Sequence, residues 1–522
     1  GSSPSEGLGD RTPSFTVFTH ARLVVRPGQV IDDGSLLVRD GVIVSARAGR
    51  EVPAGAYEVD LGGKTVFPSF IDPLSDYAQV PAPAAEPTPR DDSPSTPPPV
   101  PGARHWNARI HPELDLSLSL KPDAKQAQAL RKLGYTDVLS APEHGVLRGQ
   151  SAALSLADAP RLNAVLLKDH VAQHAAFEFS HWPASEYPAS LMGAIALLRQ
   201  TFYDVHWQGE RLAWQARHRE AERAEANQAL AALAPVVAAR QPLFFATSDE
   251  LDYARALALG QEFGLKLVLV GNGHEYREAA RLKAAGVPVV VPLVLPEAPA
   301  VEDPDRALDV ALSDLEHWEW APYNARVLAD AGVPFALTAA GLKKPDEKFW
   351  PALRKIIAAG LDESSALAAL TVQPASLLGL GDKLGTLEPG KLAHFSVADA
   401  DLFRSDKARL YATWIDGRRY EVSDPAAGEP RGNWTLAWRG VSGPAELLLS
   451  GEGGELSAKV GQRSFPAVLD GRRLTLYMPG ELLGVKRDTV AVVATIEGKT
   501  LSGRGSLDDA REFGLSGTQA SA

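Results

Sequence analysis

The stretch from residue 243 to residue 270 decides the fold class of this chain. It begins with the apolar run Leu243-Phe244-Phe245, continues with an amphipathic helical pattern from Asp249 to Gly264, and ends with the strand-like run Leu265-Lys266-Leu267-Val268-Leu269-Val270. Strand, helix and strand in this order are typical of parallel βαβ units. The alternation extends from about Thr136 to Ala339, which is long enough for a closed barrel. We therefore expect an α/β fold built around a (β/α)8 barrel over residues 67–379.

Short strand patterns flank this barrel pattern on both sides. Residues 13–66 contain β-branched runs separated by turns such as Asp40-Gly41, which predict antiparallel hairpins. Similar runs return in residues 380–424, and we expect the two segments to form one composite β-sandwich. After a linker rich in Pro, Ala and Gly, residues 430–522 predict a separate, small all-β sandwich or barrel.

Two segments have a composition that gives them little to bury. Residues 1–12 open with Gly1-Ser2-Ser3-Pro4, and we interpret them as a flexible tail left by processing or a tag. Residues 80–102 are rich in Pro and Ala, and we expect an exposed, mobile loop there.

Composition excludes several classes of function. The chain has 522 residues, a formal net charge of -12 and no stripe of Lys or Arg, so nucleic acid is not an expected partner. No apolar run reaches the length of about 18 residues that a membrane-spanning helix needs. The complete lack of Cys excludes disulfides and thiolate chemistry, and it suits an oxidising compartment. We expect an exported, periplasmic protein, with the cytoplasm as the alternative.

Two local sequences resemble a known family. The run Val66-Phe67-Pro68-Ser69-Phe70-Ile71-Asp72 resembles the first barrel strand of the amidohydrolase superfamily. The segment from Ala369 to Gly379, followed by Gly385 to Ala393, is similar to the closing segment of that superfamily. The resemblance covers roughly Phe15 to Val422 and is nearest to the imidazolonepropionase-like members. It implies a TIM-like barrel with a composite sandwich, and it leaves the C-terminal β domain outside.

The same resemblance indicates that the metal ligands of the family have been replaced. Active members use one or two divalent metals to lower the pKa of a water, and the ligands are His and acidic side chains at the ends of barrel strands. Here Leu74 and Asp76 stand where the family has Asp-x-His-x-His, and Ala339 stands where it has the Asp of the eighth strand. By alignment, Phe245 and Gly271 occupy the ligand positions of the fifth and sixth strands. We therefore expect no metal, no cofactor and no metal-dependent hydrolysis by this chain alone.

A few polar residues remain as candidates for binding a ligand at the barrel mouth. They are Asp72, His105, Trp106 and His274, each of which also has a simple structural explanation as a loop or turn residue. His170 and His174 lie four residues apart and would share one face of a helix, but no third ligand accompanies them. We interpret that pair as structural or exposed on the surface.

Three functions are consistent with these observations. The first is a catalytically silent amidohydrolase-like subunit, a pseudoenzyme, whose partner is an active amidohydrolase or a second copy of itself. The second is a hydrolase of C–N bonds in an amide, cyclic amide or peptide, which would use an unrecognised site or one shared with another chain. The third is a protein that binds a small ligand in the mouth of the barrel. The sequence leaves open whether the chain is an enzyme.

Overall fold

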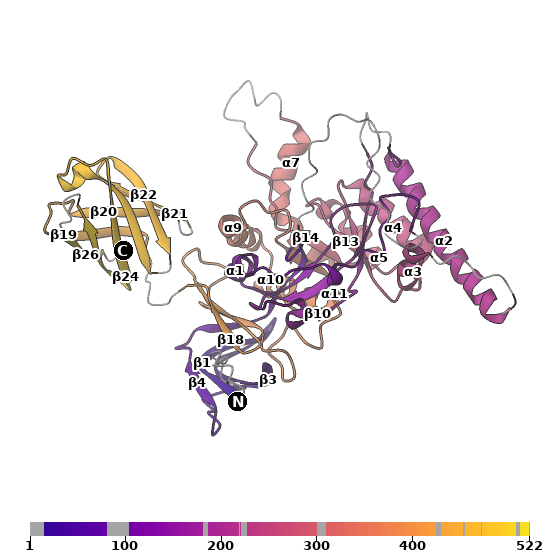
Figure 1. Cartoon of the computed structure of the whole chain (residues 1–522), viewed down its shortest axis with the longest axis horizontal. Helices are drawn as coiled ribbons and strands as arrows, with labels where there is room; N and C mark the ends of the chain where they lie inside the picture. Colours follow the sequence, from indigo (N-terminus) through magenta and orange to yellow (C-terminus); the bar gives the residue numbers. More distant parts are fainter. Residues whose placement is uncertain are drawn as a thin grey trace, which may run out of the picture. The chain divides into compact units, whose positions relative to one another are not determined.

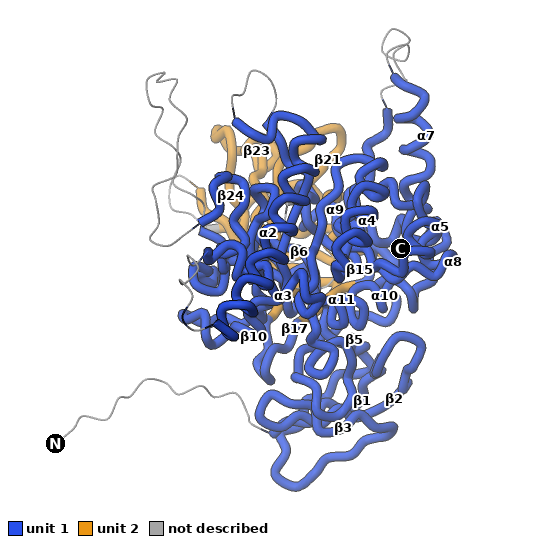
Figure 2. The backbone as a smooth tube through the Cα atoms, turned by 90° about the vertical axis from the view of Figure 1, so that its right-hand side faces the viewer, with its two compact units in different colours: residues 1–408, 413–420 blue, residues 409–412, 421–522 orange. Residues whose placement is uncertain are grey.

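The computed structural model describes most of the chain as two compact units. The described residues are 15–80, 104–180, 186–218, 220, 227–299, 310–423, 430–452, 455–470, 472–507 and 512–520. One unit comprises residues 1–408 and 413–420, and the other comprises residues 409–412 and 421–522 (Figure 2). The predicted tail at 1–12 lies outside the described residues, as does the predicted loop at 80–102 apart from Val80.

Strands from distant parts of the sequence share one eight-stranded sheet, with the order β18-β17-β16-β5-β1-β2-β3 and with β4 paired to β1. The strands are β1 (Phe15–Arg26), β2 (Gln29–Arg39), β3 (Val42–Ala48), β4 (Tyr57–Asp60), β5 (Thr65–Pro68), β16 (Phe395–Ala398), β17 (Leu410–Ile415) and β18 (Arg418–Glu421). Aromatic contacts join them: the ring of Phe18 meets Phe395 at 5.1 Å and Trp414 at 5.3 Å, both edge-on. These contacts explain why early and late strands need each other to bury their apolar faces.

Strands alternate with helices over residues 173–338, as the sequence predicts (Figure 1). Over residues 135–176 the expected alternation is wrong, because five strands follow one another there with no α-helix between them. The strands are β6 (Phe70–Ser75), β7 (Tyr135–Ser140), β8 (Leu147–Gln150), β9 (Ala152–Ser155), β10 (Leu166–Lys168), β11 (Gln173–Ala176), β12 (Leu243–Ala246), β13 (Leu267–Val270), β14 (Val289–Pro292) and β15 (Phe335–Thr338). The helices are α1 (Ala124–Leu133), α2 (Leu191–Arg217), α3 (Gln228–Val237), α4 (Leu251–Phe263), α5 (Glu275–Ala285), α7 (Leu312–Trp320), α8 (Asn324–Ala331), α9 (Pro345–Ala358), α10 (Glu363–Leu370) and α11 (Val372–Leu377). The mixed α/β class is therefore confirmed.

These strands form two separate hydrogen-bonded sheets and not one closed barrel. One sheet has the order β10-β9-β7-β6, and the other has the order β15-β14-β13-β12-β11-β8. Two strands also depart from the expected parallel direction, because β9 is antiparallel to β7 and β8 is antiparallel to β11. Only residues 141–146 separate β7 from β8. A parallel return needs a crossover of about a dozen residues or more, so this short connection forces the chain to reverse.

The run Val66 to Asp72, which we expected to be a single strand, is divided between two sheets. β5 ends at Pro68 and pairs with β1 and β16, whereas β6 begins at Phe70 and pairs with β7. Ser69 lies between them, is buried, and accepts a hydrogen bond from the backbone N–H of Gly385 at 3.1 Å. The passage from one sheet to the other is therefore tied to the closing segment of the resemblance.

The C-terminal strands close into a barrel of eight antiparallel strands. They are β19 (Gly432–Arg439), β20 (Glu446–Glu452), β21 (Glu455–Val460), β22 (Arg463–Asp470), β23 (Arg473–Pro479), β24 (Thr489–Glu497), β25 (Thr500–Ser506) and β26 (Glu512–Gln519). Pairing of β19 with β26 closes the ring, and buried side chains including Trp434, Phe465 and Phe513 fill its interior. The predicted all-β region is confirmed as a barrel. Among the described residues, no helix is long and apolar enough to cross a membrane.

Candidate functional site

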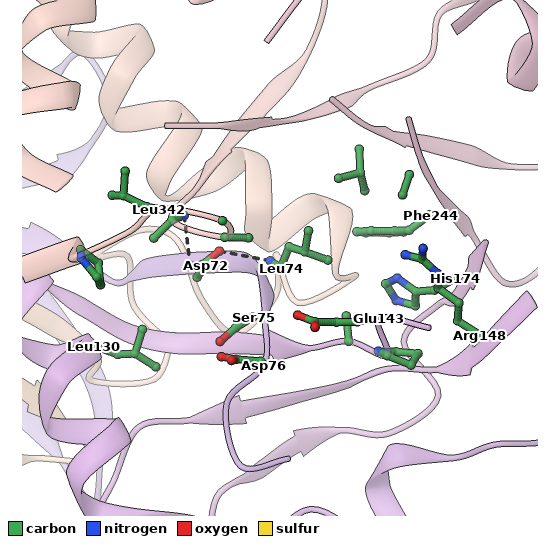
Figure 3. A pocket seen from close by; sticks show the side chains of 18 of the residues that line it. Asp72, Leu74, Ser75, Asp76, Leu130, Glu143, Arg148, His174, Phe244 and Leu342 are labelled. Atoms are coloured by element: carbon green, nitrogen blue, oxygen red, sulfur yellow. Dashed lines mark hydrogen bonds between the residues drawn. The ribbon is translucent and has the colours of Figure 1, made fainter. Parts of the chain in front are cut away.

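A cavity of about 490 Å³ lies where the parallel strands end, and we call it the mouth pocket (Figure 3). Ala246 and Val270, the last residues of β12 and β13, line it, and so does Ala339, which follows β15. Carboxyl ends of parallel strands are the usual position of active sites in α/β folds. The polar side chains that line it are Asp72, Ser75, Asp76, Glu143, Arg148 and His174.

Asp72 is the buried carboxyl group of this pocket. Its Oδ1 accepts hydrogen bonds from Thr338 Oγ1 at 2.5 Å and from the backbone N–H of Leu74 at 3.1 Å, and its Oδ2 accepts from the backbone N–H of Ala339 at 3.3 Å. Burial raises the pKa of Asp72 to about 7, although these hydrogen bonds act to lower it. Asp72 thus joins the end of β6 to the end of β15, and its oxygens are already engaged within the protein.

The replaced ligand positions on β6 and β15 do line the mouth pocket. Leu74, Asp76 and Ala339 are all part of its wall. Asp76 is exposed, whereas Leu74 packs against the buried apolar cluster that includes Phe244 and Val270. An alkyl side chain offers no lone pair, so Leu74 and Ala339 leave the pocket without two of the donors that the resemblance implies.

On β12 and β13 the residues that line the pocket are the neighbours of the two assigned positions. Phe244 lines the pocket, whereas Phe245 points to the other side of the strand and packs on Phe177 at 4.6 Å. Successive side chains of a strand face opposite sides, so a shift of one residue exchanges the pocket for the surrounding core. On β13 the lining residue is Val270 rather than Gly271. A Cβ at Gly271 would collide with the carboxylate of Glu275, which accepts hydrogen bonds from the backbone of the adjoining loop.

His174 is the residue whose place in the pocket was not foreseen. It lies on β11 in register with Phe244, and the two ring centroids are 5.2 Å apart. Its Nε2 is buried and has no hydrogen-bond partner among the described residues. Burial, reinforced by the positive charge of Arg148, lowers the pKa of His174 to about 3, so the imidazole is neutral at physiological pH. The apolar run around position 174 was a usable signal, because it favours a strand over the helix that would pair His174 with His170.

His170 lies apart from this pocket and does not share a helix with His174. It has a positive φ of 44° and its Nε2 is 2.8 Å from Asp115 Oδ2. The interpretation of His170 as a surface residue agrees with its partly exposed side chain. His174, by contrast, is buried and faces the cavity.

The other candidate ligand residues do not line the mouth pocket. His105 accepts from the backbone N–H of Asn107 at 3.0 Å, and Trp106 is 69% exposed. His274 stacks on His317 with ring centroids 3.8 Å apart, immediately before α5. Of the four candidates, only Asp72 belongs to the cavity.

The donor set does not fit the metal that the amidohydrolase resemblance implies. Within the described ranges, no group of three or more His, Asp or Glu side chains could hold a metal ion. The oxygens of Asp72 accept hydrogen bonds from Thr338 and the backbone, and the labelled side chains on the far side of the pocket are Phe244, His174, Arg148 and Glu143 (Figure 3). A catalytic metal needs about three protein ligands that converge, and these residues do not supply them.

Comparisons with known proteins agree with this architecture. The amidohydrolase family model matches residues 357–420. An amidohydrolase from Thermotoga maritima MSB8 superposes with a TM-score of 0.62 at 22% identity, covering 78% of this chain and 100% of that chain. A Xaa-Pro dipeptidase with bound methionine gives a TM-score of 0.43 at 14% identity, covering 78% of this chain and 100% of that chain. No curated protein sequence matches this chain.

The Thermotoga structure shows the shared fold, and the family model matches the closing segment that carries the resemblance. The resemblance to the amidohydrolase superfamily is therefore confirmed. The chain has the amidohydrolase fold, and its described residues hold no metal-binding group.

Proposed function

We propose that this chain is a non-catalytic amidohydrolase-like subunit that associates with a second chain of the same fold. The observation that carries the proposal is the lining of the mouth pocket. Its residues Leu74, Phe244 and Ala339 have hydrocarbon side chains, which cannot coordinate a metal. Metal-dependent hydrolysis of an amide at neutral pH needs a water that the metal activates, and the described side chains of this wall do not offer the converging donors that would hold such a metal. A chain that has lost this chemistry can still keep the surfaces by which it associates.

We also propose that the two central sheets together form the wall of a single barrel over residues 67–379. The edge strands β6 and β15 contact each other and are joined by the hydrogen bond from Thr338 to Asp72. On the other side, β8 and β9 follow each other directly and pair with β11 and β7, one sheet each. In this arrangement residues 13–66 and 380–424 form the composite sandwich, and residues 430–522 form the C-terminal domain.

The surface best suited to a partner is the outward face of α2, whose C-terminal half extends away from the central strands (Figure 1). Tyr203, Trp207 and Trp214 are 54%, 58% and 48% exposed. At 3.6 residues per turn, these three side chains fall within about 40° of one another. They lie opposite the stripe of buried residues on α2, which includes Ala194, Leu198, Thr201 and Val205. Tyr203 also contacts α4, because its ring lies 4.9 Å from Phe263 and its hydroxyl donates to Glu262. Aromatic side chains gathered on one exposed face are typical of protein interfaces.

Purification of the full chain from its native source tests this function. We expect an amidohydrolase-fold chain with an intact His-x-His motif to co-purify in stoichiometric amount. The double variant Trp207→Ala/Trp214→Ala should lose that partner, whereas Trp106→Ala, which removes an exposed aromatic residue outside α2, should keep it. A chain that purifies alone, or that turns over an amide substrate with metal bound at Asp72, would contradict the proposal.

A second candidate function is the binding of a small ligand in the mouth pocket. It is favoured by His174, whose buried Nε2 faces the cavity without a partner among the described residues. A buried polar atom without a hydrogen bond costs about 1 to 3 kcal/mol, and a ligand that completes the bond removes this cost. A screen of small molecules by thermal shift, with His174→Phe as the control, tests this function: stabilising ligands should lose their effect in the variant.

A further inference from the structure

A second cavity, of about 420 Å³, lies at the opposite ends of the same strands, and we call it the basal pocket. His170 precedes β11, Pro242 precedes β12 and Lys266 precedes β13, and all three line the cavity. Gln150, the last residue of the antiparallel strand β8, lines it as well. The basal pocket is therefore formed where the parallel strands begin, and it shares no lining residue with the mouth pocket.

The basal pocket is positively charged in a protein of net charge -12. Lys168, Arg240 and Lys266 line it, and none of the described residues in its wall is Asp or Glu. Arg240 and Lys266 are exposed and form no ion pair within the described part of the chain, while Lys168 donates only to the carbonyl of Leu378, at 2.9 Å. His170 has two carboxylates beside it, Asp115 at 2.8 Å and Asp169 at 3.4 Å, and neither of them lines the cavity. Three cationic side chains thus line one cavity whose described wall has no carboxylate.

Gln241 supplies an independent observation that points to a ligand. Its side chain is 7% exposed and lines the cavity. Its Nε2 donates to Gln150 Oε1 at 3.1 Å and to the carbonyl of His170 at 3.0 Å. Both partners are acceptors, so the orientation of the amide is fixed. The remaining Oε1 is buried and accepts no hydrogen bond from any described residue, so the pocket needs a hydrogen-bond donor there.

We infer that the basal pocket binds a small oxyanion that carries a hydroxyl group, as hydrogen phosphate does. Its charged oxygens accept hydrogen bonds from Lys168, Arg240 and Lys266, and its hydroxyl donates to Oε1 of Gln241. Sulfate has nearly the same size and shape, but at neutral pH it has no hydrogen to donate. The three cations alone would attract both anions, whereas Gln241 selects the one with a proton. This inference does not depend on the proposed function, because it concerns the other end of the strands.

Calorimetric titration of the full chain with inorganic phosphate and with sulfate, at pH 7 and matched ionic strength, tests the inference. We expect phosphate to bind at least tenfold more tightly than sulfate. Arg240→Ala/Lys266→Ala should weaken phosphate binding at least tenfold, and both residues are exposed, so the fold should tolerate the change. Lys355→Ala, which removes an exposed cation on α9 outside the pocket, should leave binding unchanged.

A variant of Gln241 separates the preference for phosphate over sulfate from the general attraction of anions by the three cations. Gln241→Leu should bring the affinity for phosphate down to that for sulfate while leaving sulfate binding as it was. If that variant does not fold, the ratio of phosphate to sulfate affinity in the unaltered chain still tests whether the pocket prefers an anion that carries a hydroxyl group. Equal binding of the two anions would reduce the pocket to a patch that attracts adventitious ions only, and no phosphate binding at millimolar concentration would overturn the inference.

Discussion

The two ends of the central strands differ in how their polar groups are used. At the mouth pocket the buried carboxyl of Asp72 accepts three hydrogen bonds from the protein itself, and Leu74 and Phe244 occupy the space around it. At the basal pocket Arg240 and Lys266 face a cavity without an ion-pair partner in the described part of the chain. The carboxyl group of Asp72 is therefore satisfied within the protein, whereas His174 Nε2 at the mouth and the two cations of the basal pocket lack such partners among the described residues.

Under the proposed function, this difference would arise because a site can lose its chemistry without losing its cavity. The strand ends still enclose about 490 Å³, because the backbone positions that form the pocket depend on packing of the whole fold. The side chains that face the cavity are under no such constraint once no metal is required. Volume alone is therefore a poor guide to activity, and the donors at each end decide what that end can bind.

The largest effect should follow an attempt to reverse the loss at the mouth. The triple variant Leu74→His, Asp76→His and Ala339→Asp should gain neither metal nor turnover, and its stability should fall. Leu74 is packed in an apolar cluster, so an imidazole there is buried without partners, at a cost of roughly 1 to 3 kcal/mol for each poorly satisfied group. The measurements are metal content, melting temperature and turnover of a panel of lactams and dipeptides.

The matched control for that variant is Leu74→Met, which changes shape but adds no strong donor and should cost less than about 1.5 kcal/mol. One equivalent of metal in the triple variant, with clear turnover and an unchanged melting temperature, would show that the mouth still preserves a catalytic geometry. The mouth pocket could then still bind a ligand through its polar groups, and it would no longer differ from the basal pocket in this respect.

The imidazole of His394, which has a carboxylate at each nitrogen, contrasts with the imidazole of His174, which has no partner among the described residues. His394 lies between Asp137, 2.8 Å from its Nδ1, and Asp416, 2.9 Å from its Nε2. Burial alone would lower the pKa of His394, but the two carboxylates raise it to about 10. His394→Leu removes the ion-pair partner of the buried Asp137, which keeps only the hydrogen bond from Thr136 Oγ1, so we expect a loss of about 3 to 5 kcal/mol by urea unfolding. Asp416→Asn, at a half-exposed position, should cost much less.

The raised pKa of His394 also predicts a dependence on pH. Its ordinary value in the unfolded chain is near 6.5, so the folded state holds an extra proton between about pH 6.5 and pH 10. The stabilisation is complete below pH 6.5 and is lost as the pH rises toward 10. The stability difference between the unaltered chain and His394→Leu should therefore shrink between pH 7 and pH 10, and a constant difference would refute the assignment.

Asp72→Asn should have a smaller effect that is visible chiefly in pH dependence. The folded carboxyl, with its pKa near 7, keeps a proton that the unfolded chain releases above about pH 4. Stability of the unaltered chain should therefore fall as pH rises from 4 to 7, by up to about 1.4 kcal/mol per pH unit relative to the variant. Urea unfolding of both proteins at four pH values measures this slope, and parallel curves would contradict the raised pKa of Asp72.

The smallest expected change is that of His174→Phe. Because the imidazole is neutral and its Nε2 lacks a partner among the described residues, a ring without polar atoms should alter stability by about 1 kcal/mol or less. A loss of several kcal/mol, measured by the same urea unfolding, would show that His174 makes a strong interaction within the protein. His174 would then not be a buried imidazole without a partner.

Some features of the site could be predicted from the sequence because they depend on residue type alone. Leu74 and Ala339 cannot donate to a metal in any conformation, and both were placed at the mouth by the motifs around them. The positions on β12 and β13 could not be fixed in the same way. No motif marks the register there, and an error of one residue exchanges Phe244 for Phe245, which faces the opposite side.

The sequence by itself determined the α/β class, the strand-helix alternation over residues 173–338 and the all-β C-terminal region, because each depends on local periodicity. Only the tertiary structure decided that Val66 to Asp72 divides between two sheets at Ser69 and that β8 and β9 run antiparallel to their neighbours. It alone brought His174 to the mouth and placed Lys168 and Lys266 in one cavity with Arg240 and Gln241. These arrangements depend on contacts between residues far apart in the chain, and no local pattern records which distant strand or loop a side chain will face.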